Sequence, residues 1–269
     1  MTAEIETTNK TFKLKKMKVR TRLIVTSIVM FFTMIWYNPL TALVSNDSII
    51  DYLSSLKKDL DLVSVSAVMV KGDKIVWKGA VGKANIEQDI DAKTSFEYQL
   101  GSVSKLFTGA ALMKLYEDGQ IDLDADINNY LPFPIRHPNF PETPITIRML
   151  LTHTSSFADA EQLQYDLYVV GDSEMSIEEL CNKYFRKNGE FYNDENWEEW
   201  EPGTKWDYCN WNFVLIGYII EQFTQMPYHE YSQKYILDPL EMKSAGWWLD
   251  RVRKQYPYLF YHWQLGFSH

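Results

Sequence analysis

Apolar residues follow two different spacings along the chain, first that of strands and later that of helices. Apolar and polar positions alternate over residues 63–70 and again over residues 75–82, on either side of a polar turn at residues 71–74. This pattern predicts an antiparallel hairpin, and a helix is expected before it, over residues 49–60. Later apolar residues recur at helical spacing and predict helices over residues 102–116, 145–152, 176–185, 211–223 and 228–236.

Strands followed by a run of helices indicate an α+β fold, or an α/β layer with a helical insertion. The polar, aspartate-rich residues 119–132 are expected to form a connection. The acidic, aromatic residues 190–203 are expected to form a solvated surface loop. The tryptophans at positions 197, 200, 206 and 211 could form an aromatic ligand platform, but packing in the core and its rim is the favoured interpretation.

The N-terminus has the features of an export segment. Six Lys or Arg residues between positions 13 and 22 precede an uncharged, apolar run at residues 23–37. This order is typical of a signal peptide, while an uncleaved helix over residues 23–44 is long enough to span a bilayer, and both alternatives remain open. In either case the basic flank stays inside, so the protein is expected to be secreted or anchored on the extracytoplasmic side. The predicted organisation is a basic segment (1–22), an anchor or signal (23–44) and a domain over residues 46–269.

Composition sets limits on the rest of the chain. With 269 residues, 46% of them hydrophobic, it can bury a substantial core as one large domain or two small ones. Seven of the 27 basic residues but only two of the 36 acidic residues lie in residues 1–45, so the remainder is strongly acidic and a poor partner for nucleic acid. Cys181 and Cys209 are the only cysteines. They could pair in an oxidising compartment but do not amount to a disulfide framework.

Two short motifs carry candidate chemistry. Ser102 and Lys105 are three residues apart and therefore lie on the same face of the predicted helix. A neutral lysine can take the proton of a serine hydroxyl and make it nucleophilic, and a helix N-terminus favours a developing oxyanion. Tyr208 and Asn210 precede a later predicted helix and can direct a phenol and a carboxamide into one cleft. Either motif alone is weak.

The order of the motifs is more specific. It runs Gly-Ser-Val-Ser-Lys (101–105), Gly119, Leu-Asp (123–124), Leu-Pro (131–132), Leu-Leu-Thr-His-Thr-Ser-Ser (150–156), Pro-Gly-Thr (202–204), Tyr-Cys-Asn (208–210) and Pro-Leu-Glu-Met (239–242). Together these resemble the serine β-lactamase-related superfamily over residues 49–248. The resemblance is greatest to its class C-like branch of β-lactamases, D-alanyl-D-alanine carboxypeptidases and esterases. It implies an α/β sandwich with an antiparallel sheet and an inserted all-helical subdomain.

The resemblance also implies roles for individual residues. Ser102 would be the acylated nucleophile, Lys105 its proton acceptor and Tyr208 the general base or proton relay. Asn210 would orient Lys105 and bind the substrate, an amide or ester of a small molecule or peptide. The Ser102 N–H would supply half of an oxyanion hole, and neither a metal nor another cofactor is implied. His153 could be mistaken for a triad base, but a buried histidine with satisfied hydrogen bonds is expected.

One part of the family pattern is missing. A third box, Lys-Thr-Gly or His-x-Gly, lies on a late strand in the family, and the sequence shows none before it ends at His269. The chain is therefore expected to be a C-terminally truncated form of an enzyme, incomplete in its last strands and helix and nearly inactive as written. The alternative is a non-catalytic, membrane-tethered binding or remnant protein that keeps the cleft.

Overall fold

The computed structural model describes residues 45–160, 163, 167 and 172–248. The predicted anchor or signal at residues 23–44 and the residues after position 248 lie outside this part. The described chain divides into two compact units, the first ending at Lys83 and including residues 91–94, the second containing residues 84–90 and everything from Ser95 onward. Among the described residues, no helix combines the length and the apolar character needed to cross a membrane.

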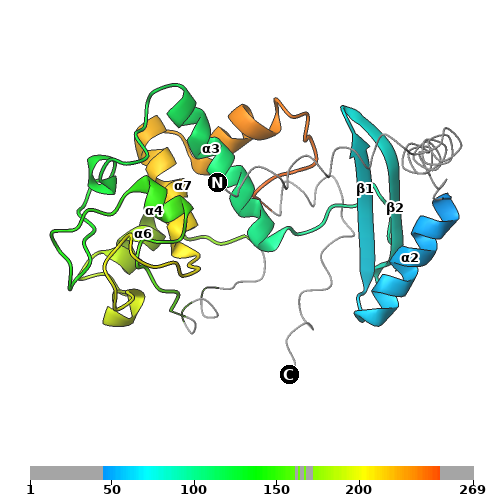
Figure 1. The fold of residues 1–269 in the computed structure, drawn as a ribbon, viewed down its shortest axis with the longest axis horizontal. Helices are drawn as coiled ribbons and strands as arrows, with labels where there is room; N and C mark the ends of the chain where they lie inside the picture. Colours follow the sequence, from blue (N-terminus) through cyan, green and yellow to red (C-terminus); the bar gives the residue numbers. More distant parts are fainter. Residues whose placement is uncertain (1–44, 161–162, 164–166, 168–171, 249–269) are drawn as a thin grey trace, which may run out of the picture. The chain divides into compact units, whose positions relative to one another are not determined.

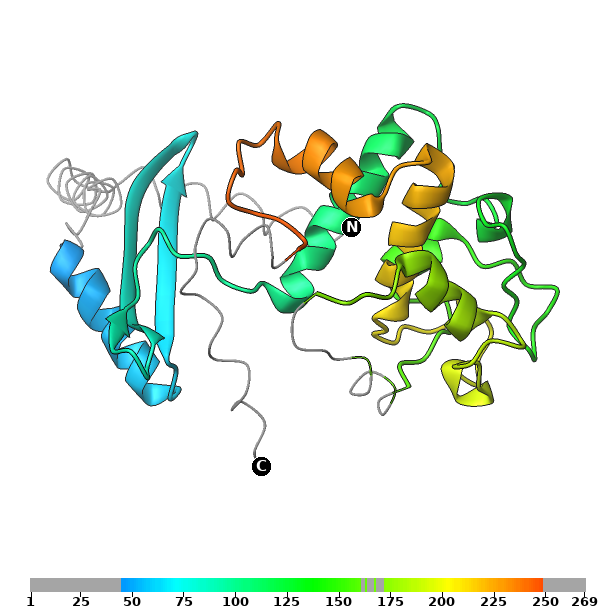
Figure 2. The same cartoon turned by 180° about the vertical axis from the view of Figure 1, so that it is seen from behind.

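The first unit is a helix and a small sheet. Helix α2 (Asn46–Asp59) begins three residues before the predicted start because Ser45 caps it, its Oγ accepting a hydrogen bond of 3.1 Å from the Ser48 N–H. Strands β1 (Ser64–Lys71) and β2 (Lys74–Asn85) form the predicted antiparallel hairpin, and the short β3 (Ile90–Asp91) follows β2 in the sheet. Helix α2 runs alongside the hairpin (Figures 1 and 2).

Gly82 is essential to the hairpin geometry. It pairs with Ser64 across the two strands and adopts a φ of +92°. A Cβ atom at this position would lie 2.2 Å from the carbonyl oxygen of Val63. Only glycine combines this left-handed backbone with so close an approach of the neighbouring strand.

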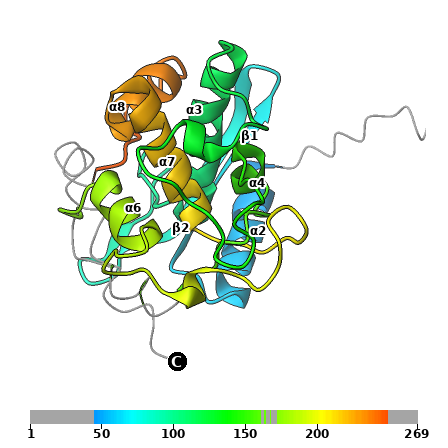
Figure 3. The same ribbon diagram turned by 90° about the vertical axis from the view of Figure 1, so that its left-hand side faces the viewer.

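The second unit is helical. Its elements are η1 (Gly101–Ser104), α3 (Lys105–Glu117), η2 (Ile127–Asn129), α4 (Ile147–Leu151), α6 (Ile177–Phe185), η3 (Asp194–Asn196), α7 (Trp211–Thr224), α8 (Tyr228–Ser232) and the π-helical η4 (Gln233–Leu237). Helix α7 is central, because α3, α4, α6 and α8 all contact it (Figure 3). The expected α+β combination of an antiparallel sheet and a helical part is confirmed.

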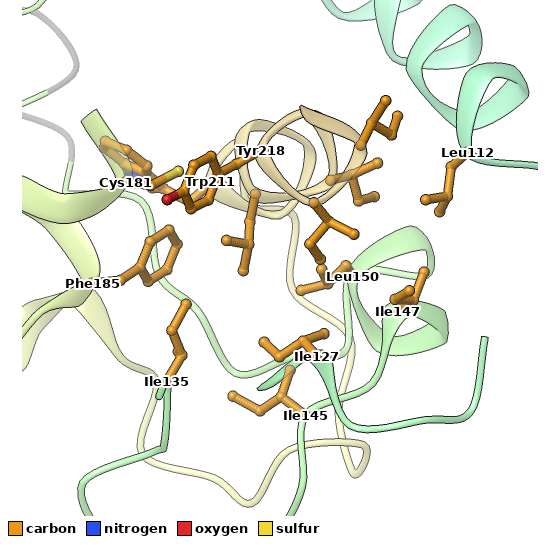
Figure 4. Close-up of a cluster of buried hydrophobic side chains, with 14 of the residues drawn as sticks. Leu112, Ile127, Ile135, Ile145, Ile147, Leu150, Cys181, Phe185, Trp211 and Tyr218 are labelled. Carbon is orange, nitrogen blue, oxygen red and sulfur yellow. The ribbon is translucent and has the colours of Figure 1, made fainter. Parts of the chain in front are cut away.

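Helix α7 carries much of the core. Leu215, Ile216 and Ile219 are fully buried along it, and Leu150 of α4 and Leu112 of α3 belong to the same cluster (Figure 4). At the start of the helix Trp211 stacks on Tyr184 of α6, with ring centroids 3.5 Å apart. Close packing of this kind fixes where α7 begins, and the proposed site residues directly precede that point.

The acidic loop differs from its prediction. Within residues 190–203, Asn196 and Trp197 are buried, and the Asn196 side chain donates hydrogen bonds to the carbonyls of Tyr184 and Phe191. The loop is therefore held against the core, and the expectation of a wholly solvated loop was wrong. Trp197 and Trp211 pack internally, as favoured, whereas Trp206 is 65% exposed. Cys181 and Cys209 are buried free thiols and do not pair.

Candidate active site

Ser102 and Lys105 meet at the start of α3. Gly101 has a φ of +51°, which turns the chain into the short η1 helix that contains Ser102. Lys105 is the first residue of α3, and its Nζ donates a hydrogen bond of 3.3 Å to Ser102 Oγ. Ser102 therefore lies in a 3₁₀ turn and not in the α-helix itself, but the predicted proximity of the hydroxyl and the amine is present.

Tyr208 and Asn210 reach the same point from the segment before α7. The Tyr208 hydroxyl donates a hydrogen bond of 2.7 Å to Ser102 Oγ. Lys105 Nζ donates to Asn210 Oδ1 at 2.6 Å and lies 5.0 Å from the centre of the Tyr208 ring. The four residues singled out from the sequence thus form one connected group. Ser102 Oγ is its exposed end and Lys105 is partly buried behind it.

Asp159 belongs to this group and was missed in the sequence. Its Oδ2 accepts a hydrogen bond of 2.8 Å from Asn210 Nδ2, and its Oδ1 accepts one of 2.8 Å from the Asn210 backbone N–H. The Cys209 thiol also donates to Oδ1, at 3.2 Å. Burial, followed by the charge of Asp159, raises the pKa of Cys209, so this thiol stays protonated as a donor. Nothing in the spacing of Asp159 relative to the motifs indicated this contact.

His153 supports the Tyr208 segment. Its ring stacks on Tyr208 with centroids 4.6 Å apart, and its Nδ1 lies 3.2 Å from both the Cys209 backbone nitrogen and Asn212 Nδ2. Because Nδ1 accepts from these donors, the neutral ring carries its proton on Nε2. Burial and then the positive charge of Lys105 lower the pKa of His153. No hydrogen bond joins His153 to Ser102, both of which the structure describes, and His153 is half-buried where a buried side chain was expected.

The described residues contain no group of three or more His, Cys, Asp or Glu side chains placed to hold a metal ion. The arrangement offers a hydroxyl flanked by an amine and a phenol, with an amide and a carboxylate behind the amine. Such a group can move a proton away from the hydroxyl and back to a leaving group.

Comparison with known proteins identifies the family of the chain. The family profile described as Beta-lactamase matches residues 49–261. The chain belongs to the beta-lactamase family. Among curated proteins, Protein flp of Staphylococcus aureus (strain MW2) is 26% identical over 204 residues, which are 75% of this chain and 39% of that protein. The putative penicillin-binding protein PbpX of Bacillus subtilis (strain 168) is 26% identical over 213 residues, 79% of this chain and 47% of that protein.

Solved structures share the fold of this chain. The octameric penicillin-binding protein homologue from Pyrococcus abyssi is 27% identical with a TM-score of 0.65, covering 77% of this chain and 46% of that chain. The D-amino acid amidase from Ochrobactrum anthropi SV3, complexed with L-phenylalanine amide, is 25% identical with a TM-score of 0.59. The match covers 74% of this chain and 52% of that chain. The chain spans less than half the length of the two curated relatives, Protein flp and PbpX.

Proposed function

We propose that this protein is a serine hydrolase that forms an acyl-enzyme on Ser102 with an amide or ester substrate. The observation that carries the proposal is the contact of Ser102 Oγ with both the Tyr208 hydroxyl, at 2.7 Å, and Lys105 Nζ, at 3.3 Å. A serine hydroxyl gains nucleophilic power only when a neighbouring base can take its proton. Two groups able to exchange protons here converge on one exposed oxygen.

Each residue has a distinct task in the proposed reaction. Ser102 Oγ attacks the substrate carbonyl carbon, an Oγ–C bond forms, and the hydroxyl proton passes to Lys105 or Tyr208. The bond from the carbonyl carbon to the leaving nitrogen or oxygen then breaks, and the leaving group takes up a proton and becomes an amine or alcohol. Water attacks the resulting ester, the C–Oγ bond breaks, and a carboxylic acid leaves while Oγ regains a proton.

Asn210 and the backbone complete the proposed site. Asn210 Oδ1 accepts from Lys105 Nζ at 2.6 Å and so holds the amine beside Ser102. The Ser102 N–H is assigned as one donor to the oxyanion of the tetrahedral intermediate. Membership of the beta-lactamase family and the likeness to an amidase support amide or ester bonds as the substrate class.

We further propose that residues 1–44 direct the hydrolase to the extracytoplasmic side, either as a membrane anchor or as a signal. The support is the basic cluster followed by an uncharged apolar run in this part of the sequence.

Covalent labelling tests the hydrolase proposal. The full chain is incubated with a fluorophosphonate probe and, separately, with a fluorescent penicillin, and bound label is mapped by peptide mass spectrometry. We expect label on Ser102, lost in Ser102→Ala and retained in Ser54→Ala, which removes an exposed serine hydroxyl of α2. Label on Ser102 would also contradict the expectation, drawn from the missing third box, that the chain is nearly inactive as written. A folded wild-type chain that neither probe labels would overturn the proposal. Saturable ligand binding unchanged by Ser102→Ala and Lys105→Ala would favour the non-catalytic alternative.

A further inference from the structure

We propose that Asp159 is a positioning residue of the site, which orients the Asn210 amide so that its carbonyl oxygen faces Lys105. The inference rests on the proposed hydrolase function and adds a residue to it. Asp159 lies 51 positions before Asn210 in the chain and contacts it through both carboxylate oxygens. The segment carrying Asp159 and the segment before α7 are therefore joined at the amide that holds the candidate proton acceptor.

The argument begins with the two ends of the Asn210 side chain. A carboxamide has a donating NH2 group and an accepting oxygen of nearly equal size, so its orientation depends on its partners. An ionised carboxylate only accepts, and a lysine ammonium only donates. Asp159 Oδ2 takes the Nδ2 end at 2.8 Å, which leaves Oδ1 for Lys105 Nζ at 2.6 Å. The reverse orientation would place the Asn210 NH2 group against the Lys105 amine and the Asn210 oxygen against the Asp159 carboxylate.

The same carboxylate also fixes the backbone that carries Tyr208. Asp159 Oδ1 accepts from the Asn210 N–H and from the Cys209 thiol. Asn210 precedes α7 directly, and its side chain makes no capping bond to that helix. A negative charge at this place is favoured by the helix dipole. Asp159 thus holds Cys209 and Asn210, the two residues that follow Tyr208 in the chain. One carboxylate therefore positions both the Tyr208 segment and the amide that contacts Lys105.

Asp159→Asn is the sharpest substitution because it keeps the size of the side chain. In the wild type, the Asn210 N–H and Nδ2 each donate to a different oxygen of Asp159. The amide of the variant has only one accepting oxygen, so its NH2 group would face one of these two donors. We expect the rate constant for acylation of Ser102 to fall about 10²-fold, as for a small misplacement of a catalytic group, while KM changes less than about twofold. Loss of the negative charge of Asp159 is also expected to change the pH profile of kcat/KM.

Asp126→Asn is the matched control. Asp126 is likewise partly buried and accepts hydrogen bonds from a backbone N–H, that of Asn128, and from a side chain, that of Arg136. Neither of these partners is a residue of the candidate active site. Its loss is expected to lower stability without moving the pH profile or the acylation rate of the folded protein. A purely structural role of Asp159 would give the same result as this control.

The outcomes separate this inference from the proposed function. A wild-type chain without label overturns the hydrolase proposal itself. A labelled wild type, with Asp159→Asn acylated at the same rate and with the same pH profile, overturns only the role of Asp159. If Asp159→Asn does not fold, Asp159→Glu gives the decision, because it keeps the charge and both acceptors but displaces them by one methylene. We expect about a tenfold lower rate there with an unmoved pH profile, and a wild-type rate would contradict the proposal.

Discussion

Tyr208 is the residue whose chemistry can be tested with least disturbance to the fold. It is 39% exposed, and its hydroxyl donates to Ser102 Oγ. Tyr208→Phe removes this hydroxyl and keeps the ring stacked on His153. Because general acid–base groups typically contribute about 10²–10⁴-fold, we expect the acylation rate to fall by a factor in this range. The measurement is the rate of labelling by a fluorophosphonate probe.

A second tyrosine provides the control for this substitution. Tyr116, near the end of α3, is 44% exposed, and Tyr116→Phe also removes one phenol oxygen. We expect wild-type labelling rates for it and melting temperatures close to wild type for both variants. Equal rates in Tyr208→Phe and wild type would remove Tyr208 from the proposed proton transfer.

His153 links the geometry of the site to pH. Its Nδ1 accepts from the Cys209 N–H and from Asn212 Nδ2, so a protonated ring would turn a donor toward two donors. Burial and the charge of Lys105 lower the pKa of His153 below its usual 6.5, while Asp159 and Asp207 act in the opposite direction. The unfolded chain therefore binds more protons just below pH 6.5 than the folded one. The stability contributed by neutral His153 is full above about pH 6.5 and is lost as the pH falls toward the lowered pKa.

His153→Asn tests this contribution. Asparagine keeps an acceptor near the Nδ1 position, tolerates the φ of +54° at this residue and does not titrate. We expect the free energy of unfolding of the wild type to fall more between pH 7.5 and 5.5 than that of His153→Asn, measured by urea unfolding at both pH values. Other titrating groups are common to both proteins and cancel in the difference. Parallel losses in the two proteins would show that His153 does not contribute.

At the scale of the element, α3 offers a matched pair of leucines. Leu112 is fully buried in the core cluster, whereas Leu106, on the same helix, is 72% exposed. Leu112→Ala is expected to lower the free energy of unfolding by about 2–5 kcal/mol through lost burial and a remaining cavity. Leu106→Ala is expected to change it by less than about 0.5 kcal/mol. Chemical denaturation of both variants is the measurement, and equal losses would contradict the assignment of the core face.

The helices were predictable where local signals and burial agree. The helix predicted over residues 176–185 is α6 (Ile177–Phe185), because Ser176 caps it through a 3.1 Å bond to the Glu179 N–H. The predicted helix over residues 211–223 is α7, one residue longer. The helix predicted over residues 228–236 is split, since α8 ends at Ser232 and η4 continues with π-helical hydrogen bonding. Single π-helical turns inside helices are rare, and the apolar spacing of residues 228–236 was interpreted as one α-helix.

Contacts between distant segments were not predictable in this way. The order of short motifs in the sequence was enough to identify Ser102, Lys105, Tyr208 and Asn210. Asp159 and the buried Asn196 depend on which loops meet in space, and both are polar residues whose surroundings in the chain resemble ordinary surface loops. A buried polar side chain is stable only when its partners are supplied by the tertiary fold, so one sequence alone gives no sign of it.

At the scale of the whole molecule, the proposed location depends on residues 1–44. Arginine in the middle of an inserting apolar segment costs about 2.5–3.5 kcal/mol, so Val29→Arg is expected to reduce export of the chain sharply. Thr21→Arg adds the same charge to the basic flank and is expected to leave export intact. Cell fractionation with alkaline carbonate extraction, together with protease accessibility in spheroplasts, measures both variants.

The same experiment distinguishes an anchor from a signal. Wild-type chain that resists carbonate extraction and keeps residues 23–44, as judged by intact mass, is an anchored protein, whereas a shorter mass and release into the medium identify a cleaved signal. Equal export of Val29→Arg and Thr21→Arg would show that the apolar run does not direct the chain across the membrane. The hydrolase proposal would stand unaffected by that result, because Ser102, Lys105, Tyr208 and Asn210 all lie in the second unit, beyond residue 94.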